Sequence, residues 1–237
     1  MRKLAIMQPY FFPYIGYFSL IKHTDEFIIF DAVQFIRHGW IERNRILKQG
    51  GDWIYVKAPL KKFEQATQIK DVEIDNTQEW KAKINAQLQT YKKIAPFYKE
   101  IRLLIDDIFD DSYSDIVSLN KAILEKVCGY IGFEPKISVY SEMNLEIEPP
   151  QAPDEWALNI CKALGDVSEY WNQPGGASFF DKSKYDNAGI DLRFIHVNLE
   201  QYDQKLPKFE AGLSIIDVLM FNAPEKINEM LDNYELT

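Results

Sequence analysis

A short segment near the N-terminus combines an amide, aromatic hydroxyls and backbone restraints. It reads Met7-Gln8-Pro9-Tyr10-Phe11-Phe12-Pro13-Tyr14-Ile15-Gly16-Tyr17-Phe18. Two prolines hold such a loop in place at low entropic cost, and a glycine lets a ligand approach the backbone. We therefore expect part of a functional site here, with a rigid aromatic turn that packs the core as the alternative. The candidate residues are Gln8, Tyr10, Gly16 and, as catalytic groups, Tyr14 and Tyr17.

Positive charge is concentrated in a second segment. Seven Lys or Arg and two acidic residues lie between positions 36 and 62, although the whole chain has a net charge of −9. Guanidinium groups bind phosphate or carboxylate in a bidentate manner, and tryptophans offer flat faces to a base or sugar. The segment therefore predicts an anion-binding site, with a solvated basic loop as the alternative. The interleaving of aromatic rings and charges also fits a single-stranded nucleic acid. Its candidate residues are Arg37, Trp40, Arg43, Asn44 and Arg45.

Two further features could supply acid–base chemistry or hold a phosphate. His38 has polar neighbours and titrates near neutral pH, so it is the candidate general base, whereas His196 lies in an apolar strand pattern and is expected in the core. Gly175 and Gly176 follow an expected strand, where backbone amides can cradle a phosphate. An ordinary tight turn is the alternative for this glycine pair.

Composition limits the classes of protein that fit. Hydrophobic residues make up 46% and charged residues 27%, which is typical of a globular chain. The net negative charge argues against a stable nucleic-acid complex. Two cysteines in unrelated apolar segments and three scattered histidines predict no metal site and fit a cytoplasmic protein. Prolines interrupt the apolar N-terminal stretch, so we expect a strand, a turn and a helix there, and no membrane segment.

The pattern along the chain alternates strands with helices and predicts an α/β protein with a mainly parallel sheet and flanking helices. Strands are expected at 4–7, 26–30, 52–56, 69–74, 136–140, 169–171 and 192–197. Helices are expected at 14–22, 154–164 and 214–221, with a short one ending near 189 and a last one from Pro224. Between them, a helical insertion is expected at about 77–132, opened by an Asn76–Glu79 capping box. We expect one domain over 1–237, with the proline-rich stretch 146–153 as a candidate linker.

The opening segment and several later motifs resemble the WbqC-like family of bacterial proteins. The later motifs are Asp31-Ala32-Val33-Gln34-Phe35, Trp40-Ile41-Glu42-Arg43-Asn44-Arg45-Ile46, Pro174-Gly175-Gly176 and Leu213-Ser214-Ile215-Ile216-Asp217. They run through almost the whole chain and add Asp31 and Ser214 to the candidate binding residues. The resemblance implies a context of O-antigen or other polysaccharide biosynthesis, and a glycine transferase that acylates an amino sugar.

A second likeness concerns the chemistry. Residues 13–17 have the layout of the His-x-Gly-His turn of nucleotidylyltransferases and related amide ligases, with Tyr14 and Tyr17 in place of both histidines. This likeness implies a nucleotidylyltransferase-like sheet and ATP, with Mg²⁺, as a cofactor. The leading hypothesis is a transferase or adenylate-forming amide ligase that binds a nucleotide sugar or another anionic substrate. The alternative is a non-catalytic accessory protein that binds the same ligand.

Overall fold

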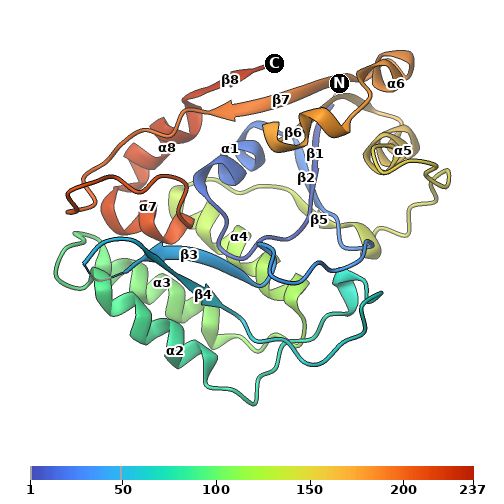
Figure 1. Ribbon diagram of the computed structural model, residues 1–237. Coiled ribbons are helices and arrows are strands. Elements are labelled where there is room, and N and C mark those ends of the chain that lie inside the picture. Colours follow the sequence, from blue (N-terminus) through green and yellow to red (C-terminus); the bar gives the residue numbers. More distant parts are fainter. Residues whose placement is uncertain (1, 49) are drawn as a thin grey trace.

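A six-stranded sheet lies at the centre of the computed structural model, which describes residues 2–48 and 50–237 (Figure 1). The strand order is β5-β2-β1-β6-β7-β8, and all neighbouring pairs are parallel except β7 and β8. The strands are β1 (Arg2–Met7), β2 (Glu26–Ile29), β5 (Ile137–Val139), β6 (Val167–Asn172), β7 (Asp191–Val197) and β8 (Tyr234–Leu236). The expected α/β class with a mainly parallel sheet is confirmed.

The first two strands form the expected parallel pair. They run in register from Leu4 opposite Glu26 to Met7 opposite Ile29, and helix α1 (Ile15–His23) connects them. The chain then moves outward to β5 and returns to the other side of β1 with β6 and β7. The chain therefore adds strands first on one side of β1 and then on the other. The point between β1 and β6 where this order reverses is where open α/β sheets bind ligands.

Helices cover both faces of the sheet, because alternate strand residues point to opposite sides. Leu4, Ile6 and Ile28 pack in one cluster with residues of α5 (Glu155–Leu164) and α6 (Lys182–Asn187). The intervening residues, such as Ala5, belong to a larger cluster on the opposite face. That cluster includes side chains of α1, α4 (Ile116–Ile131), α7 (Ile215–Phe221) and α8 (Pro224–Asp232). Both faces are thus buried, as parallel sheets require.

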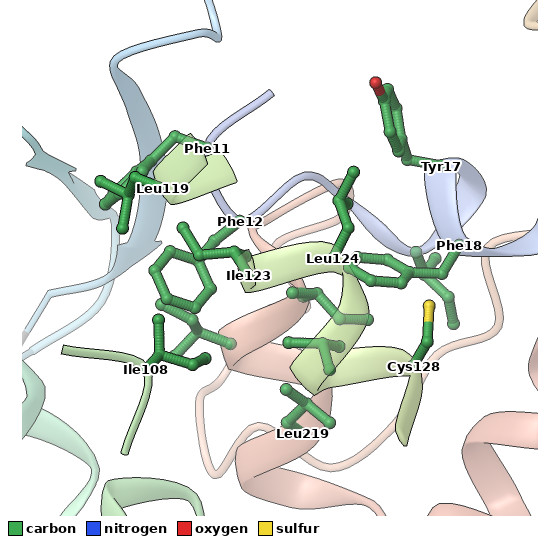
Figure 2. Close-up of a cluster of buried hydrophobic side chains, with 14 of the residues drawn as sticks. Phe11, Phe12, Tyr17, Phe18, Ile108, Leu119, Ile123, Leu124, Cys128 and Leu219 are labelled. Atoms are coloured by element: carbon green, nitrogen blue, oxygen red, sulfur yellow. The ribbon is translucent and has the colours of Figure 1, made fainter. Parts of the chain in front are cut away.

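Three helices between β4 and β5 build the second half of the larger cluster. They are α2 (Trp80–Gln87), which continues as the 3-10 turn η2 (Leu88–Tyr91), then α3 (Tyr98–Asp110) and α4. Figure 2 shows the apolar face of α4 packed against Phe11, Phe12 and Phe18, with Ile108 of α3 and Leu219 of α7 close by. Asp115 caps α4 at its start, and Gly132 ends it with a φ of 105°.

Two local predictions are wrong. The segment 69–74 is not a strand: Ile69–Asp71 is a 3-10 turn (η1), and Ile74 forms an isolated bridge with Leu60. Its backbone amides donate to loop carbonyls, so no ladder can form. The capping box does not form either, because the Asn76 amide donates to the Tyr113 carbonyl (2.7 Å) and Glu79 makes no side-chain cap.

A two-stranded hairpin was only half predicted. Its strands are β3 (Arg43–Leu47) and β4 (Trp53–Lys57), which pair in antiparallel fashion. The sequence predicts the second strand. It does not predict β3, because this strand lies in the basic segment, whose charges indicate an anion-binding site instead. The terminal β8 and the 3-10 turn η3 (Tyr140–Glu142) were not predicted, whereas the 3-10 turn η4 (Pro174–Phe179) contains the tight turn offered for Gly175 and Gly176.

Candidate functional site

A cleft of about 600 Å³ lies at the carboxyl edge of the sheet, where β1, β2 and β6 end. Each of these strands contributes residues at its end: Gln8 follows β1, Phe30 follows β2, and Asn172 ends β6. The start of α5 supplies Trp156, and the segment after η4 supplies Phe180. The cleft therefore occupies the reversal point of the strand order, where this class of fold places its ligands.

The lining of this cleft is aromatic and uncharged. The rings of Phe30 and Trp156 lie 5.3 Å apart, and Tyr170 and Phe180 lie 5.8 Å apart. No acidic or basic side chain is found among the described residues that line it. Its remaining aromatic and amide side chains are Gln8, Tyr10, Gln34, Asn172 and Phe179. Such a surface suits a flat or ring-shaped ligand whose hydroxyls or amides bond to side-chain amides.

Gln8 and Tyr10 are the predicted site residues that line the cleft. The Gln8 side chain has no hydrogen-bond partner among the residues that the structure describes, so its amide can serve a ligand. Tyr10 packs on the ring of Tyr17, with centroids 5.4 Å apart, and burial raises the pKa of its hydroxyl. At neutral pH Tyr10 is therefore a neutral hydrogen-bonding group.

Tyr17 lies beneath the cleft and not on it. Its side chain has no exposed surface, and its hydroxyl donates to the backbone carbonyl of Gln8. Burial raises the pKa of this hydroxyl well above its ordinary value. Tyr17 therefore positions the loop that carries Gln8, and it does not contact a ligand in the cleft.

Tyr14 covers the first turn of α1. Its hydroxyl donates to Oε1 of Gln173, and Nε2 of Gln173 donates to the carbonyl of Gly16 (2.7 Å). A Cβ at Gly16 would lie 2.5 Å from the Tyr14 ring, so only glycine fits beneath it. Burial raises the pKa of Tyr14 to about 12. This neutral ring over the helix start leaves a triphosphate no access there, so the residues present do not fit ATP at the position that the His-x-Gly-His likeness implies.

Buried polar side chains clamp the loop from the opposite side. Asn44 donates from Nδ2 to the carbonyls of Phe11 (3.1 Å) and Phe12 (3.0 Å). The hydroxyl of Ser214, which caps α7, also donates to the Phe12 carbonyl (2.8 Å). Asn44 is 5% exposed and Ser214 is fully buried, so both hold the loop and neither faces the cleft.

Arg37 lies beside the cleft in an adjoining hollow. This hollow measures about 440 Å³ and shares Gln34 and Ile36 with the cleft. The Arg37 guanidinium stacks on Phe63, 3.9 Å from the ring centroid. His38 follows in an exposed turn with a φ of 63°, where its backbone amide donates to Glu42 (2.8 Å). Of the three predicted arginines, only Arg37 is near the cleft.

Arg43 and Arg45 lie together on one face of the hairpin, opposite to the face that buries Asn44. The Arg43 guanidinium is 4.1 Å from the ring centroid of Tyr55. The Arg45 guanidinium lies between Trp40 (5.6 Å) and Trp53 (5.3 Å) and donates to the Gly212 carbonyl (3.1 Å). These side chains form a second surface, which we call the hairpin face, and they do not line the cleft.

The other predicted residues have structural contacts. Asp31 is 1% exposed, and its carboxylate accepts from the amide (3.1 Å) and hydroxyl (2.6 Å) of Ser141, which fixes the turn after β5. Gly175 and Gly176 lie in η4, where the Gly176 amide donates to the Gln173 carbonyl (3.2 Å). The glycine pair therefore forms a tight turn at the side of the cleft.

Of the residues that line the cleft, the sequence identifies only Gln8 and Tyr10 as candidates. Phe30 and Asn172 carried a usable signal, because each lies at the carboxyl end of an expected strand, as Gln8 does. Trp156 carried none: it follows the proline-rich stretch and reaches the cleft only because α5 packs on the sheet.

The strand order and the position of the cleft define a doubly wound α/β protein with its ligand site at the reversal point. The chain belongs to the WbqC-like protein family, whose pattern matches residues 8–229. It is similar to the Uncharacterized protein Rv1507c of Mycobacterium tuberculosis, with 31% identity over 225 residues and 94% of each chain covered. No solved structure gives a significant match.

Within residues 2–48 and 50–237, no three His, Cys, Asp or Glu side chains are grouped as a metal ion would need. None of the helices in this part of the chain is long and apolar enough to cross a bilayer. Both cysteines are buried free thiols, and burial raises their pKa.

Proposed function

We propose that the chain binds a nucleotide-linked amino sugar in the cleft and acylates its amine in the biosynthesis of a surface polysaccharide. The observation that carries this proposal is an uncharged cleft at the reversal point of the sheet, lined by aromatic rings and side-chain amides. A sugar or base ring packs on such rings, while the Gln8 amide bonds to its polar groups. Arg37 in the adjoining hollow takes the phosphate oxygens.

The proposed reaction is acyl transfer from a glycyl ester or glycyl adenylate. The amine nitrogen attacks the carbonyl carbon of the donor, an amide bond forms, and the C–O bond to the donor breaks. The amine loses one proton, which His38 accepts in this proposal. His38 lies in an exposed turn that directly follows Arg37 in the chain, and this adjacency supports its assignment as the base.

One observation favours a second candidate function, namely a non-catalytic protein that binds the same activated sugar. The described residues that line the cleft include no carboxylate, imidazole or thiol, and burial keeps Tyr10 and Tyr170 neutral. Such a protein delivers its ligand to an enzyme or protects it. The two candidates share the cleft and differ only in turnover.

Calorimetric titration with a nucleotide-linked amino sugar tests the shared part. Trp156→Ala should weaken binding about 10-fold or more, since it removes one wall of the cleft, and Leu103→Ala on the exposed surface of α3 is the control. Equal affinity of the Trp156 variant and the parent would overturn the cleft assignment. Incubation with glycine plus ATP, or with glycyl-tRNA, then separates the candidates: an amide product supports the transferase, and binding without product supports the accessory protein.

A further inference from the structure

The arginines of this chain fall into two groups. Arg2, Arg102 and Arg193 each form a salt bridge with a carboxylate, as expected in a chain with a net charge of −9. The three others are Arg37, Arg43 and Arg45. No carboxylate lies within salt-bridge distance of these three in the part of the chain that the structure describes, and they stack on aromatic rings instead.

The hairpin face holds two of these guanidinium groups in fixed positions. Arg43 and Arg45 are two residues apart on β3, so both point to the same side, while Asn44 and Ile46 between and beside them are buried. Arg43 donates to the carbonyl of His38 and Arg45 donates to that of Gly212, and the Nε atoms of both are buried without a partner. The two groups are thus ordered, positively charged and only partly satisfied.

Aromatic rings and further cations extend this face. Trp40 is 40% exposed, Trp53 and Tyr55 are half-buried, and Lys57 lies opposite Arg43 in the ladder. Past the end of β3 a groove of about 840 Å³ begins. Its cationic lining residues are Lys48, Lys92, Lys93 and Lys205. The acidic groups nearest in the chain are Asp52, Asp203, which pairs with Lys205, and Glu42, which is 7% exposed.

We propose that the hairpin face, together with this groove, binds an unpaired stretch of a nucleic acid. Guanidinium and ammonium groups in series would bind successive phosphates, and Trp40 and Trp53 would stack with bases. The net charge of the whole chain predicts no stable nucleic-acid complex, whereas the folded chain places Arg43 and Arg45, two of these three arginines, on one side of the hairpin. The biological role of this surface rests on the proposed function: the hairpin face would hold a glycyl donor that is carried on RNA.

The test measures binding of fluorescently labelled single-stranded RNA and DNA oligonucleotides to the full chain by anisotropy. Arg43→Gln and Arg45→Gln should each weaken binding about 10-fold and lower the slope of log K against log salt by about 0.7 per lost phosphate contact. Arg193→Gln removes the same charge from a carboxylate-paired site and should leave binding unchanged. Lys57→Gln, an exposed position without a salt bridge, should weaken binding a few-fold and does not threaten folding.

A second comparison separates base stacking from charge alone. Trp40→Ala should weaken binding of the oligonucleotide about 10-fold and leave binding of heparin, which has no bases, nearly unchanged. Equal loss with both ligands, or no oligonucleotide binding at low salt, would overturn the proposal, as would oligonucleotide binding that Lys57→Gln and both arginine variants leave intact. Titration of the arginine variants with the nucleotide-linked sugar keeps the two proposals apart, because the cleft should bind it as before.

Discussion

Tyr14 and Tyr17 differ in what surrounds their hydroxyls, although the sequence treats them as a pair. Tyr17 is fully buried and donates to the Gln8 carbonyl, whereas Tyr14 is half-buried and donates to Gln173. Helix α1 begins at Ile15, so Tyr14 is its extended N-cap residue and the Tyr14 ring covers the helix start, whereas Tyr17 lies inside the helix and its ring enters the core.

Tyr17→Phe should therefore destabilise the fold and spare the cleft. The substitution keeps the ring but leaves the Gln8 carbonyl without its donor, which costs about 1–2 kcal/mol of unfolding free energy. Urea unfolding of the variant should show a lower midpoint with an unchanged m-value, and the variant should bind the activated sugar with normal affinity. Normal stability with lost binding would instead assign the hydroxyl to the ligand.

At the scale of elements, the loop 8–14 is held by groups that come from distant parts of the chain. Asn44 of β3 and Asn120 of α4 donate to four loop and hairpin carbonyls, namely those of Phe11, Phe12, Pro9 and Ile41. The prolines limit the loop's own conformations, but these amides fix its position against the hairpin. The geometry of the cleft therefore depends on the hairpin and on α4.

Asn44→Ala should cost about 2–4 kcal/mol, since it leaves the Phe11 carbonyl and the Arg45 amide without their partners and takes one of two donors from the Phe12 carbonyl. Chemical denaturation measures this loss. Asn198→Ala removes an exposed amide of the same size, whose side chain bonds only to Asn233 among the described residues, and it should change stability by no more than about 0.5 kcal/mol. Similar small effects for both variants would mean that Asn44 does not fix the loop.

Local patterns were sufficient for most elements because burial follows strand and helix periodicity. The strands β1, β2 and β7 and the helices α5 and α7 lie close to their expected ranges. The failures have a common cause: the side-chain pattern does not report which backbone groups pair. Residues 69–74 bury Ile69, Val72 and Ile74, yet their backbone amides donate to loop carbonyls and not to a neighbouring strand. In β3, charged side chains lie on the face where the Arg43 guanidinium stacks on an aromatic ring. Trp156 reaches the cleft by tertiary packing, which spacing along the chain does not encode.

At the scale of the whole molecule, the carboxylates differ in whether a cation lies beside them. Most acidic side chains whose pKa is shifted, such as Glu26 and Asp232, pair with lysines or arginines. Burial alone would raise the pKa of these carboxyls, but the neighbouring cations lower it. One carboxylate is different, because Asp217 lies in the core and none of the described cations pairs with it.

Asp217 makes the stability of the molecule depend on pH in an unusual direction. Its carboxylate accepts from the hydroxyls of Tyr91 (2.8 Å) and Tyr202 (2.6 Å) and from the amide of Gln204 (2.8 Å). Burial outweighs these donors and raises the pKa of Asp217 from 3.8 to about 6. The folded chain therefore holds this proton more tightly than the unfolded chain does. The stabilising contribution is complete below pH 4 and is lost as the pH rises through 6.

Comparison of the parent with Asp217→Asn isolates this contribution from the paired carboxylates, which act in the opposite direction. The difference in unfolding free energy, parent minus variant, should fall by about 3 kcal/mol between pH 4 and pH 7, because two pKa units correspond to roughly that amount. Urea unfolding at a series of pH values measures it. Asp203→Asn is the matched control: Lys205 lowers the pKa of this exposed carboxyl, so its difference should not fall with pH. A parent-minus-variant difference for Asp217 that stays level or rises would show that the carboxylate is ionised in the core across the whole range, with its three donors outweighing burial.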